Sequence, residues 1–263
     1  MRKSVLCIAG TDPTGGAGIQ ADLQVLARCG VHGMAVPTAL IEQDSRGVTR
    51  VHSVFPSILE RQLLACFEDA PPDAIKLGAL ATDETVRAVV RFLHRYGPLP
   101  VVLDPVLQAS GGAFLLERRA WDTLRDELLP QVTLITPNLA EAGHLTGVDP
   151  PVSLEGMEEV AQKLIGLGAA SVLLKGGHLP GEPADLLIHA DERRVFRGKR
   201  FEGEVHGTGC ALSSSLAAGL ALGLTVPEAA SRAHAWVQAA IVRSEQRGKG
   251  RRTLDYGVPF QED

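Results

Sequence analysis

Aromatic residues and long apolar runs are scarce in this chain, and each scarcity excludes a class of protein. Phe, Trp and Tyr make up only 4% of the 263 residues, which argues against a surface that stacks nucleic-acid bases. No apolar run reaches the length of a membrane span, and the apolar stretch near the N-terminus ends at Gly10, too early for a signal sequence. We therefore expect no nucleic-acid or membrane partner and a cytoplasmic location.

Paired cysteines and a phosphate-binding P-loop are also missing. Cys7, Cys29, Cys66 and Cys210 stand far apart, and no histidine lies at zinc-finger spacing. Neither a disulfide framework nor a structural zinc site is expected, and Cys7 and Cys66 lie among apolar residues typical of a core. Because the pattern G-x-x-x-x-G-K-[ST] does not occur, any nucleotide site must be of another type.

The charge is balanced, with 26 basic and 31 acidic residues and a formal net charge of -5. One dense basic run, Arg247-Gly248-Lys249-Gly250-Arg251-Arg252, could bind phosphate or RNA, but no wider basic face accompanies it. We interpret it as part of a solvated, loosely ordered tail over residues 247–263. The tail follows a single domain over residues 1–246.

Short apolar runs alternate with longer amphipathic stretches. The expected strands cover residues 5–9, 35–41, 74–77, 101–104, 133–136, 171–175 and 186–189. The expected helices cover residues 19–29, 57–69, 83–96, 117–128, 139–146, 154–167, 211–222 and 227–244. Near-continuous apolar strands are buried on both faces, and strand–helix alternation is typical of a mostly parallel sheet between helices. The fold class is therefore α/β.

Polar residues follow most of the expected strands, at the edge where ligands of such sheets bind. In chain order they are Gly10-Thr11-Asp12, Glu42-Gln43-Asp44, Lys76 with Gly78, Asp104, Asn138 with Glu141, and Lys175-Gly176-Gly177-His178. Carboxylate and amide oxygens suit Mg²⁺, and lysine and backbone amides suit phosphates. The set therefore favours a magnesium-bound phosphate.

The run His206-Gly207-Thr208-Gly209-Cys210 opens an apolar, alanine-rich helix. Glycines let backbone N–H groups crowd around an anion, and a helix start adds partial positive charge. A thiol at this point is expected to lose its proton more easily than a free thiol. The turn could offer an anion cradle together with a base or nucleophile; the alternative is a buried cysteine after a glycine turn.

Several single positions leave two interpretations open. The run Gly15-Gly16-Ala17-Gly18 has more glycines than a tight turn needs, which favours close approach to a substrate. Asp22 either favours the helix dipole or contacts a substrate. Gln43 can read the edge of a heterocycle, or is a plain loop residue. Asn138 and Glu141 share one helical face, as ligands or as a helix cap and its partner.

Together these motifs resemble the hydroxymethylpyrimidine/phosphomethylpyrimidine kinases of thiamine biosynthesis, which belong to the ribokinase-like superfamily. The match runs in order from about residue 5 to residue 222, through residues 9–23, 38–48, 104–106, 134–142, 174–178 and 206–210. It implies a three-layer ribokinase-like fold with ATP and Mg²⁺ as cofactors. The implied reaction transfers the γ-phosphate to 4-amino-5-hydroxymethyl-2-methylpyrimidine or to its monophosphate. The resemblance also implies a homodimer.

The resemblance assigns roles to the matching residues. Gln43 and the backbones of Gly10 and Val106 would hold the pyrimidine, with Asp22 nearby. Asp104, Asn138 and Glu141 would organise Mg²⁺, partly through water, together with the phosphates, which Lys175 would steady. Gly207, Thr208 and Gly209 would supply the anion hole. Cys210 would take the proton from the attacking hydroxyl, where sugar kinases of the superfamily carry aspartate.

The chain departs from the family pattern in the loop after Asp104-Pro105-Val106. The family usually shows Met-Val-Ala-Lys-Ser-Gly-Asp, whereas residues 107–113 read Leu-Gln-Ala-Ser-Gly-Gly-Ala, so the lysine and aspartate are replaced by Ser110 and Ala113. Glu42 replaces a small residue beside the pyrimidine site, and either favours a ring amine or points away. These changes leave two alternatives: a pyridoxine or pyridoxal kinase, and a catalytically decayed protein that binds a pyrimidine or nucleotide.

Overall fold

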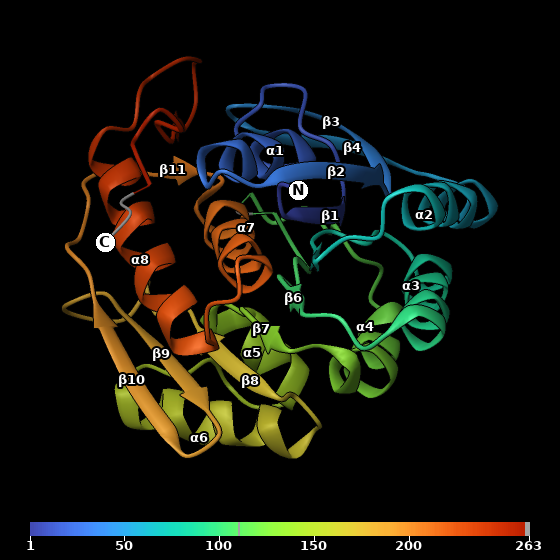
Figure 1. The fold of residues 1–263 in the computed structure, drawn as a ribbon. Coiled ribbons are helices and arrows are strands. Elements are labelled where there is room, and N and C mark those ends of the chain that lie inside the picture. The colour runs from blue at the N-terminus through green and yellow to red at the C-terminus, as the bar shows by residue number, and fades with distance from the viewer. Residues whose placement is uncertain (110, 261–263) are drawn as a thin grey trace.

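The computed structural model describes residues 1–109 and 111–260, and its core is an eight-stranded sheet between two helical layers (Figure 1). The strands lie in the order β10 (Glu192–Arg197), β9 (Ala184–His189), β8 (Ser171–Leu174), β7 (Leu134–Ile135), β6 (Val101–Leu103), β5 (Ala74–Leu77), β1 (Ser4–Ala9) and β2 (His32–Pro37). Within this sheet the six neighbours β2, β1, β5, β6, β7 and β8 run parallel. Strand β9 pairs antiparallel with β8, and β10 pairs antiparallel with β9. The mostly parallel α/β sheet is confirmed.

The helices divide between the two faces of the sheet. One face carries α1 (Gly18–Arg28), α7 (Thr208–Ala221) and α8 (Val226–Val242). The other carries α2 (Pro56–Asp69), α3 (Asp83–Tyr96), α4 (Ala120–Thr123), α5 (Leu139–Thr146) and α6 (Leu154–Gly166). A hydrophobic core lies on each face of the sheet, and alternate residues of a strand point into one or the other. Val5 and Cys7 of β1 belong to the core beside α1 and α7, and Leu6 and Ile8 to the core beside α2 and α3. The expected three-layer fold is therefore present.

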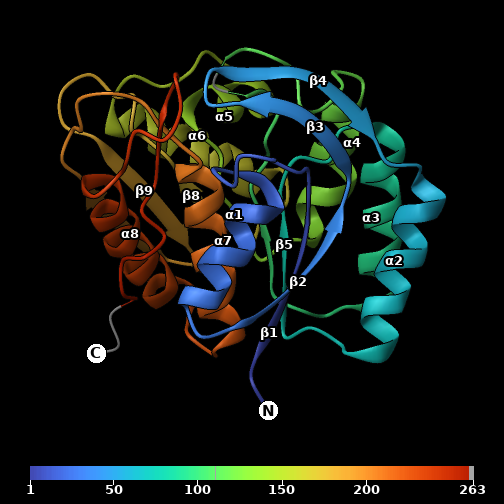
Figure 2. The same ribbon diagram turned by 90° about the horizontal axis from the view of Figure 1, so that it is seen from above.

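One expected helix and one expected strand differ in detail. The helix expected over residues 117–128 is α4, which continues as a π-helical turn, η1 (Leu124–Leu128), and a 3-10 turn, η2 (Leu129–Gln131). The strand expected over residues 35–41 is two strands: β2 ends at Pro37, and β3 (Ala39–Asp44) leaves the sheet to pair with β4 (Gly47–Ser53). Figure 2 shows this hairpin across one end of the sheet. Its half-exposed β4 has no apolar run to reveal it.

The end of the chain is packed, so the expectation of a loosely ordered tail is wrong for residues 252–258. Strand β12 (Arg252–Thr253) pairs in parallel with β11 (Val205–His206). Val258 is buried, and its carbonyl accepts a hydrogen bond of 3.0 Å from the Trp236 indole of α8. The basic run also finds partners, because Arg251 pairs with Glu204. The division of the chain at residue 246 stays a prediction.

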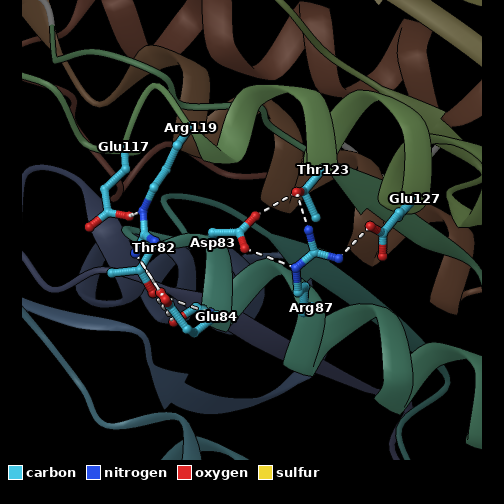
Figure 3. A network of polar contacts seen from close by, with 9 residues as sticks. Thr82, Asp83, Glu84, Arg87, Glu117, Arg119, Thr123 and Glu127 are labelled. Atoms are coloured by element: carbon cyan, nitrogen blue, oxygen red, sulfur yellow. Dashed lines mark hydrogen bonds and ion pairs between the residues drawn. The ribbon is translucent and has the colours of Figure 1, made fainter.

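A polar network joins the start of α3 to the segment of α4 and η1 (Figure 3). The Thr82 hydroxyl caps α3 by accepting a hydrogen bond from the Thr85 N–H. Arg87 donates to Asp83 at 2.8 Å and to the Thr123 hydroxyl at 3.1 Å, and Thr123 donates in turn to Asp83. Thr123 is therefore the buried centre of the contact between these two helical segments.

We expect Thr123→Val to lower the free energy of unfolding by about 1–2 kcal/mol, because Asp83 and Arg87 both lose a hydrogen-bond partner at a buried position. Urea unfolding followed by circular dichroism measures the change. Arg91→Ala is the matched control, since it removes only the exposed ion pair between Arg91 of the same helix and Glu60 of α2. Equal losses in the two variants would contradict a special role for Thr123.

Candidate active site

A cleft opens at the carboxyl ends of the parallel strands, between the start of α7 and the β3–β4 hairpin. Its volume is about 330 Å³, within the range of pockets that hold small molecules. Every site residue predicted from the sequence except Asp22 lines it: Gly10, Gln43, Asp104, Val106, Asn138, Glu141, Lys175, Gly207, Thr208, Gly209 and Cys210. The topology thus brings together residues more than 190 positions apart in the chain.

The glycine turn forms the N-terminus of α7. Gly207 adopts a left-handed conformation, with φ 84°, and the helix begins at Thr208. A Cβ on Gly207 would lie 1.8 Å from the Gly16 carbonyl oxygen, so only glycine fits this close approach. The first N–H groups of a helix have no partner within it, and those of residues 208–210 border the cleft. The turn has the chemistry of an anion-binding site.

Cys210 lies in the first turn of α7, and its thiol is less acidic than the sequence suggested. Burial raises the pKa of Cys210 to about 11, and the carboxylates of Asp22 and Asp104 add to the rise. Lys76 and the Gly18 N–H act in the opposite direction but are outweighed. The expectation that the helix start makes the thiol more acidic is therefore wrong. Burial and two nearby anions outweigh the partial positive charge of the helix.

Asp104 and Lys175 form an ion pair at the centre of the cleft. Their atoms Oδ1 and Nζ lie 2.7 Å apart, and the Thr136 hydroxyl donates to the same carboxylate at 3.3 Å. Gly209 lies directly against this pair, because a Cβ on it would be 3.1 Å from the Lys175 Nζ. The lysine ammonium therefore borders the anion-binding turn, where it can bind phosphate oxygens.

Asn138 and Glu141 form a capping box at the start of α5, so the structure bears out the helix-cap interpretation. The Asn138 side chain accepts from the Glu141 N–H at 2.9 Å, and Glu141 accepts from the Asn138 N–H at 2.8 Å. Burial raises the pKa of Glu141 to about 7, against the opposing charge of Lys175. Both side chains also line the cleft, so capping does not remove them from the site.

The donor set fits a loosely held Mg²⁺ rather than a dedicated metal cage. Among residues 1–109 and 111–260 no group of three or more His, Cys, Asp or Glu side chains could hold a metal ion. The cleft nevertheless presents the carboxylates of Asp104 and Glu141. Mg²⁺ commonly keeps several waters and binds one or two carboxylates plus substrate phosphates. A divalent cation would also compensate the buried Glu141 in its ionised form.

The glycine loop after β1 is tied to the glycine turn. The Asp12 carboxylate accepts from the Ala17 N–H at 2.8 Å and lies 2.9 Å from the Nε2 atom of His206. Hydrogen bonds from His206 and Thr14 lower the pKa of Asp12 despite its burial. Gly18 has φ 58°, and a Cβ there would lie 2.5 Å from the Gly10 carbonyl oxygen. The extra glycines thus serve close backbone contacts around the cleft.

The hairpin places Gln43 and Glu42 differently. Gln43 lines the cleft, and its amide donates to the Thr11 carbonyl at 3.1 Å. Glu42 is largely exposed, and its carboxylate lies 2.6 Å from the Nε2 atom of His52 on β4. A register shift in the hairpin falls between the two residues. Of the two interpretations of Glu42, the structure supports the one in which it points away.

Asp22 does not border the cleft, in contrast to its predicted role beside the pyrimidine. It is fully buried, and its carboxylate accepts two hydrogen bonds of 2.9 Å from the Lys76 ammonium. Lys76 does line the cleft, as expected of the polar residues at the strand ends, although the sequence assigned it no individual role there. The signal was a lysine inside the apolar strand β5, where a charge is costly unless it is paired. Asp22 therefore lies behind Lys76, and its predicted place near the pyrimidine stays a prediction.

A loop after β6 and a wall formed by β10 and α8 also line the cleft. The loop over residues 107–113 borders it through Gln108 and Ala109, and the Ala109 N–H donates to the Ala113 carbonyl at 2.8 Å. Ser110 lies outside the described residues. The other end of the cleft is lined by Phe196 of β10 and by residues of α8 such as His234. The sequence did not reveal the part of this wall formed by β10, because no strand was predicted there.

Comparison with known proteins decides the family. The model of the phosphomethylpyrimidine kinase family matches residues 12–255. The chain belongs to this family. A hydroxymethylpyrimidine/phosphomethylpyrimidine kinase of Rhizobium meliloti is 42% identical over 95% of the chain and 96% of that protein. A thiamine biosynthesis bifunctional protein of Geobacter sulfurreducens is 43% identical over 95% of the chain, but the chain spans only 51% of that protein.

Solved structures agree with the phosphomethylpyrimidine kinase family. The phosphomethylpyrimidine kinase of Clostridium difficile superposes with a TM-score of 0.82 at 37% identity, covering 91% of this chain and 100% of that one. An ADP complex of Bacillus subtilis pyridoxal kinase gives a TM-score of 0.90 at 30% identity, covering 98% of each chain. The chain therefore has the ribokinase-like fold and is a small-molecule kinase. No helix within the described residues is long and apolar enough to cross a membrane.

Proposed function

We propose that this family member uses ATP to phosphorylate 4-amino-5-hydroxymethyl-2-methylpyrimidine, its monophosphate or both, in thiamine biosynthesis. One observation supports it most. The anion-binding turn of residues 207–210 lies against the Asp104–Lys175 pair, in the same cleft as Gln43. Phosphoryl transfer depends on alignment and on compensation of negative charge, which this arrangement provides. We also propose a cytoplasmic homodimer without nucleic-acid or membrane partners, as the sequence suggested.

In this mechanism the substrate lies between Gln43 and Cys210. The hydroxymethyl O–H bond breaks, its proton passes to the Cys210 thiolate, and the oxygen forms a bond to the γ-phosphorus while the bond to the leaving ADP oxygen breaks. The N–H groups of Gly207, Thr208 and Gly209 stabilise the charge on the transferred group. Lys175 holds the phosphates. The backbones of Gly10 and Val106 border the ring.

Mg²⁺ would be held by Asp104 and Glu141, with Asn138 contributing partly through water. When bound, the cation would neutralise negative charge on the phosphates. The chain's own part is to keep both carboxylates at the cleft. Asn138 holds Glu141 at the cleft through the capping box. Lys175 holds Asp104 there through the ion pair.

Coupled ADP release from the purified protein with Mg-ATP tests the proposal. Hydroxymethylpyrimidine, its monophosphate and pyridoxine are offered in parallel. Turnover on either pyrimidine supports the proposal, and the preferred one identifies the step that the altered loop at Ala113 allows. Turnover on pyridoxine alone would favour the pyridoxal kinase activity of the Bacillus subtilis neighbour. ATP binding without any turnover would indicate the decayed, ligand-binding alternative.

We expect Gln43→Leu to raise the KM for the pyrimidine by about tenfold or more, because the ring loses a hydrogen-bonding partner inside the cleft. Steady-state kinetics with ATP at saturation measures the change. Glu42→Gln is the matched control on the neighbouring residue, whose side chain is exposed and bonded to His52. A similar rise in KM for both variants would show that the hairpin itself, and not the Gln43 amide, sets the affinity.

A further inference from the structure

Lys76 is a fully buried lysine in the central strand β5, and it has a specific set of partners. Its ammonium lies 2.9 Å from both carboxylate oxygens of Asp22. The Ser214 hydroxyl donates to Asp22 at 2.7 Å. A buried ion pair of this kind contributes little net stability compared with apolar residues of the same size. Its presence at the floor of the cleft therefore calls for another explanation.

The pair is tied to the helix that carries Cys210. Ser214 lies four residues after Cys210, so the two side chains share one face of α7. Strand β5 packs directly against α7, and Lys76 and Cys210 both line the cleft. The contacts Lys76–Asp22–Ser214 thus hold a cation between β5 and the first turns of α7, the helix that carries Cys210.

The charges that face Cys210 nearly cancel. The cations are Lys76 of β5 and Lys175 after β8, and the anions are Asp22 of α1 and Asp104 after β6. Cys7 of β1 and Tyr256 also face this region and are neutral, because burial raises the pKa of both. A thiolate at Cys210 adds a negative charge, and Lys76 and the Gly18 N–H are the groups that most directly favour it.

We propose that Lys76, held in place by Asp22 and Ser214, is a positioning residue whose fixed positive charge compensates the Cys210 thiolate, and that Asp22 moderates this effect. The inference deepens the proposed function, on which it rests for the use of the thiolate as a base. When the thiol ionises, its S–H bond breaks and the proton passes to solvent. The thiolate then accepts the proton of the substrate hydroxyl.

Alkylation of Cys210 by iodoacetamide tests this without any kinase activity. The thiolate is the reacting species, so the rate between pH 6 and pH 10, followed by mass spectrometry of the Cys210 peptide, reports its ionisation. We expect Asp22→Asn to raise the rate at pH 8 by about tenfold, since Lys76 is no longer neutralised. We expect Lys76→Met to lower it by about tenfold, since the cation is lost. Lys163→Met, which removes an exposed lysine of α6, should leave it unchanged.

Opposite changes in the two variants support the inference, and a change of the same sign in both overturns it. If the pair only stabilised the fold, breaking it would loosen the site in both variants and change the alkylation rate in the same direction. If Lys76→Met alone does not fold, because Asp22 is left unpaired, the comparison is made between Asp22→Asn and the double variant with Lys76→Met. Slower alkylation in the double variant supports the inference, and an equal rate overturns it. The pH profile of kcat should shift to lower pH in Asp22→Asn and to higher pH in Lys76→Met.

The two proposals can fail separately. Kinase activity that survives in Cys210→Ala removes the base role while the alkylation result still decides whether Lys76 controls the thiol. Loss of all kinase activity on pyrimidines, with opposite alkylation shifts retained, removes the proposed substrate but supports the electrostatic role of Lys76. Equal alkylation rates in an active enzyme overturn the inference alone.

Discussion

Replacing Cys210 with alanine should lower kcat by about 10²–10⁴-fold, the range expected when a general base is lost. The substitution removes the only thiol of the cleft wall formed by residues 207–210 and leaves the backbone N–H groups in place. The fold and ATP binding should be retained, because alanine is a good helix former at a position in the first turn of α7. ADP release at saturating substrate, together with calorimetric ATP binding, measures both effects.

Two further variants sharpen this result. Cys66→Ala is the matched control, since Cys66 lies on α2, away from the cleft, and we expect wild-type turnover. Cys210→Asp restores a group that can accept a proton, the residue that sugar kinases of the superfamily carry there, and should retain more activity than Cys210→Ala. Turnover near wild type in Cys210→Ala would remove the base assignment.

Gly207→Ala should cost about 2–5 kcal/mol of unfolding free energy and abolish most activity. The left-handed backbone of Gly207 costs an alanine about 1–2 kcal/mol. The new Cβ would also lie 1.8 Å from the Gly16 carbonyl oxygen, and relieving such overlap adds about 1–3 kcal/mol. Because the turn must move, its N–H groups leave the positions that face the phosphate, and displacement of about 1 Å can cost 10²-fold in rate.

Gly223→Ala is the matched control for this prediction. Gly223 also has a positive φ, of 89°, but a Cβ there meets nothing within 4 Å. The Gly223→Ala variant should therefore lose only about 1–2 kcal/mol of unfolding free energy, the cost of the backbone conformation, and keep its activity. Thermal and urea unfolding measure both variants. Equal destabilisation of the two would show that the Gly16 carbonyl can move aside at little cost.

The sequence predicted the sheet well where strands are buried on both faces. Strands β1, β5 and β8 are short, nearly continuous apolar runs that stand out directly in the sequence, although β5 also carries Lys76. The hairpin β3–β4 and the edge strand β10 were missed or misread because β4 and β10 contain no buried residue and β3 alternates buried with exposed ones. The packing of residues 252–258 was missed for another reason: single apolar residues such as Val258 are held by distant partners, which no local pattern shows.

The candidate site was largely predictable because its residues follow the strands of a parallel sheet, whose carboxyl ends meet. What the sequence could not show was how deeply each side chain is buried and which distant residues surround it. Asp22 lies one turn into α1, and no local pattern shows that it is fully buried and paired with Lys76 of another element. The acidity of Cys210 depends on burial and on two carboxylates from other elements, so a motif of five residues could not reveal it.

The contact between β11 and β12 has a consequence for the order in which the protein is made. Strand β11 ends at His206, directly before the anion-binding turn, and its pairing partner β12 begins at Arg252. The Tyr256 hydroxyl also donates to the Gly16 carbonyl at 2.8 Å, the same group that confines Gly207. Synthesis must therefore reach about residue 256 before the proposed phosphate site can acquire its final shape. A nascent chain that still lacks this last segment has the catalytic motif but not its support.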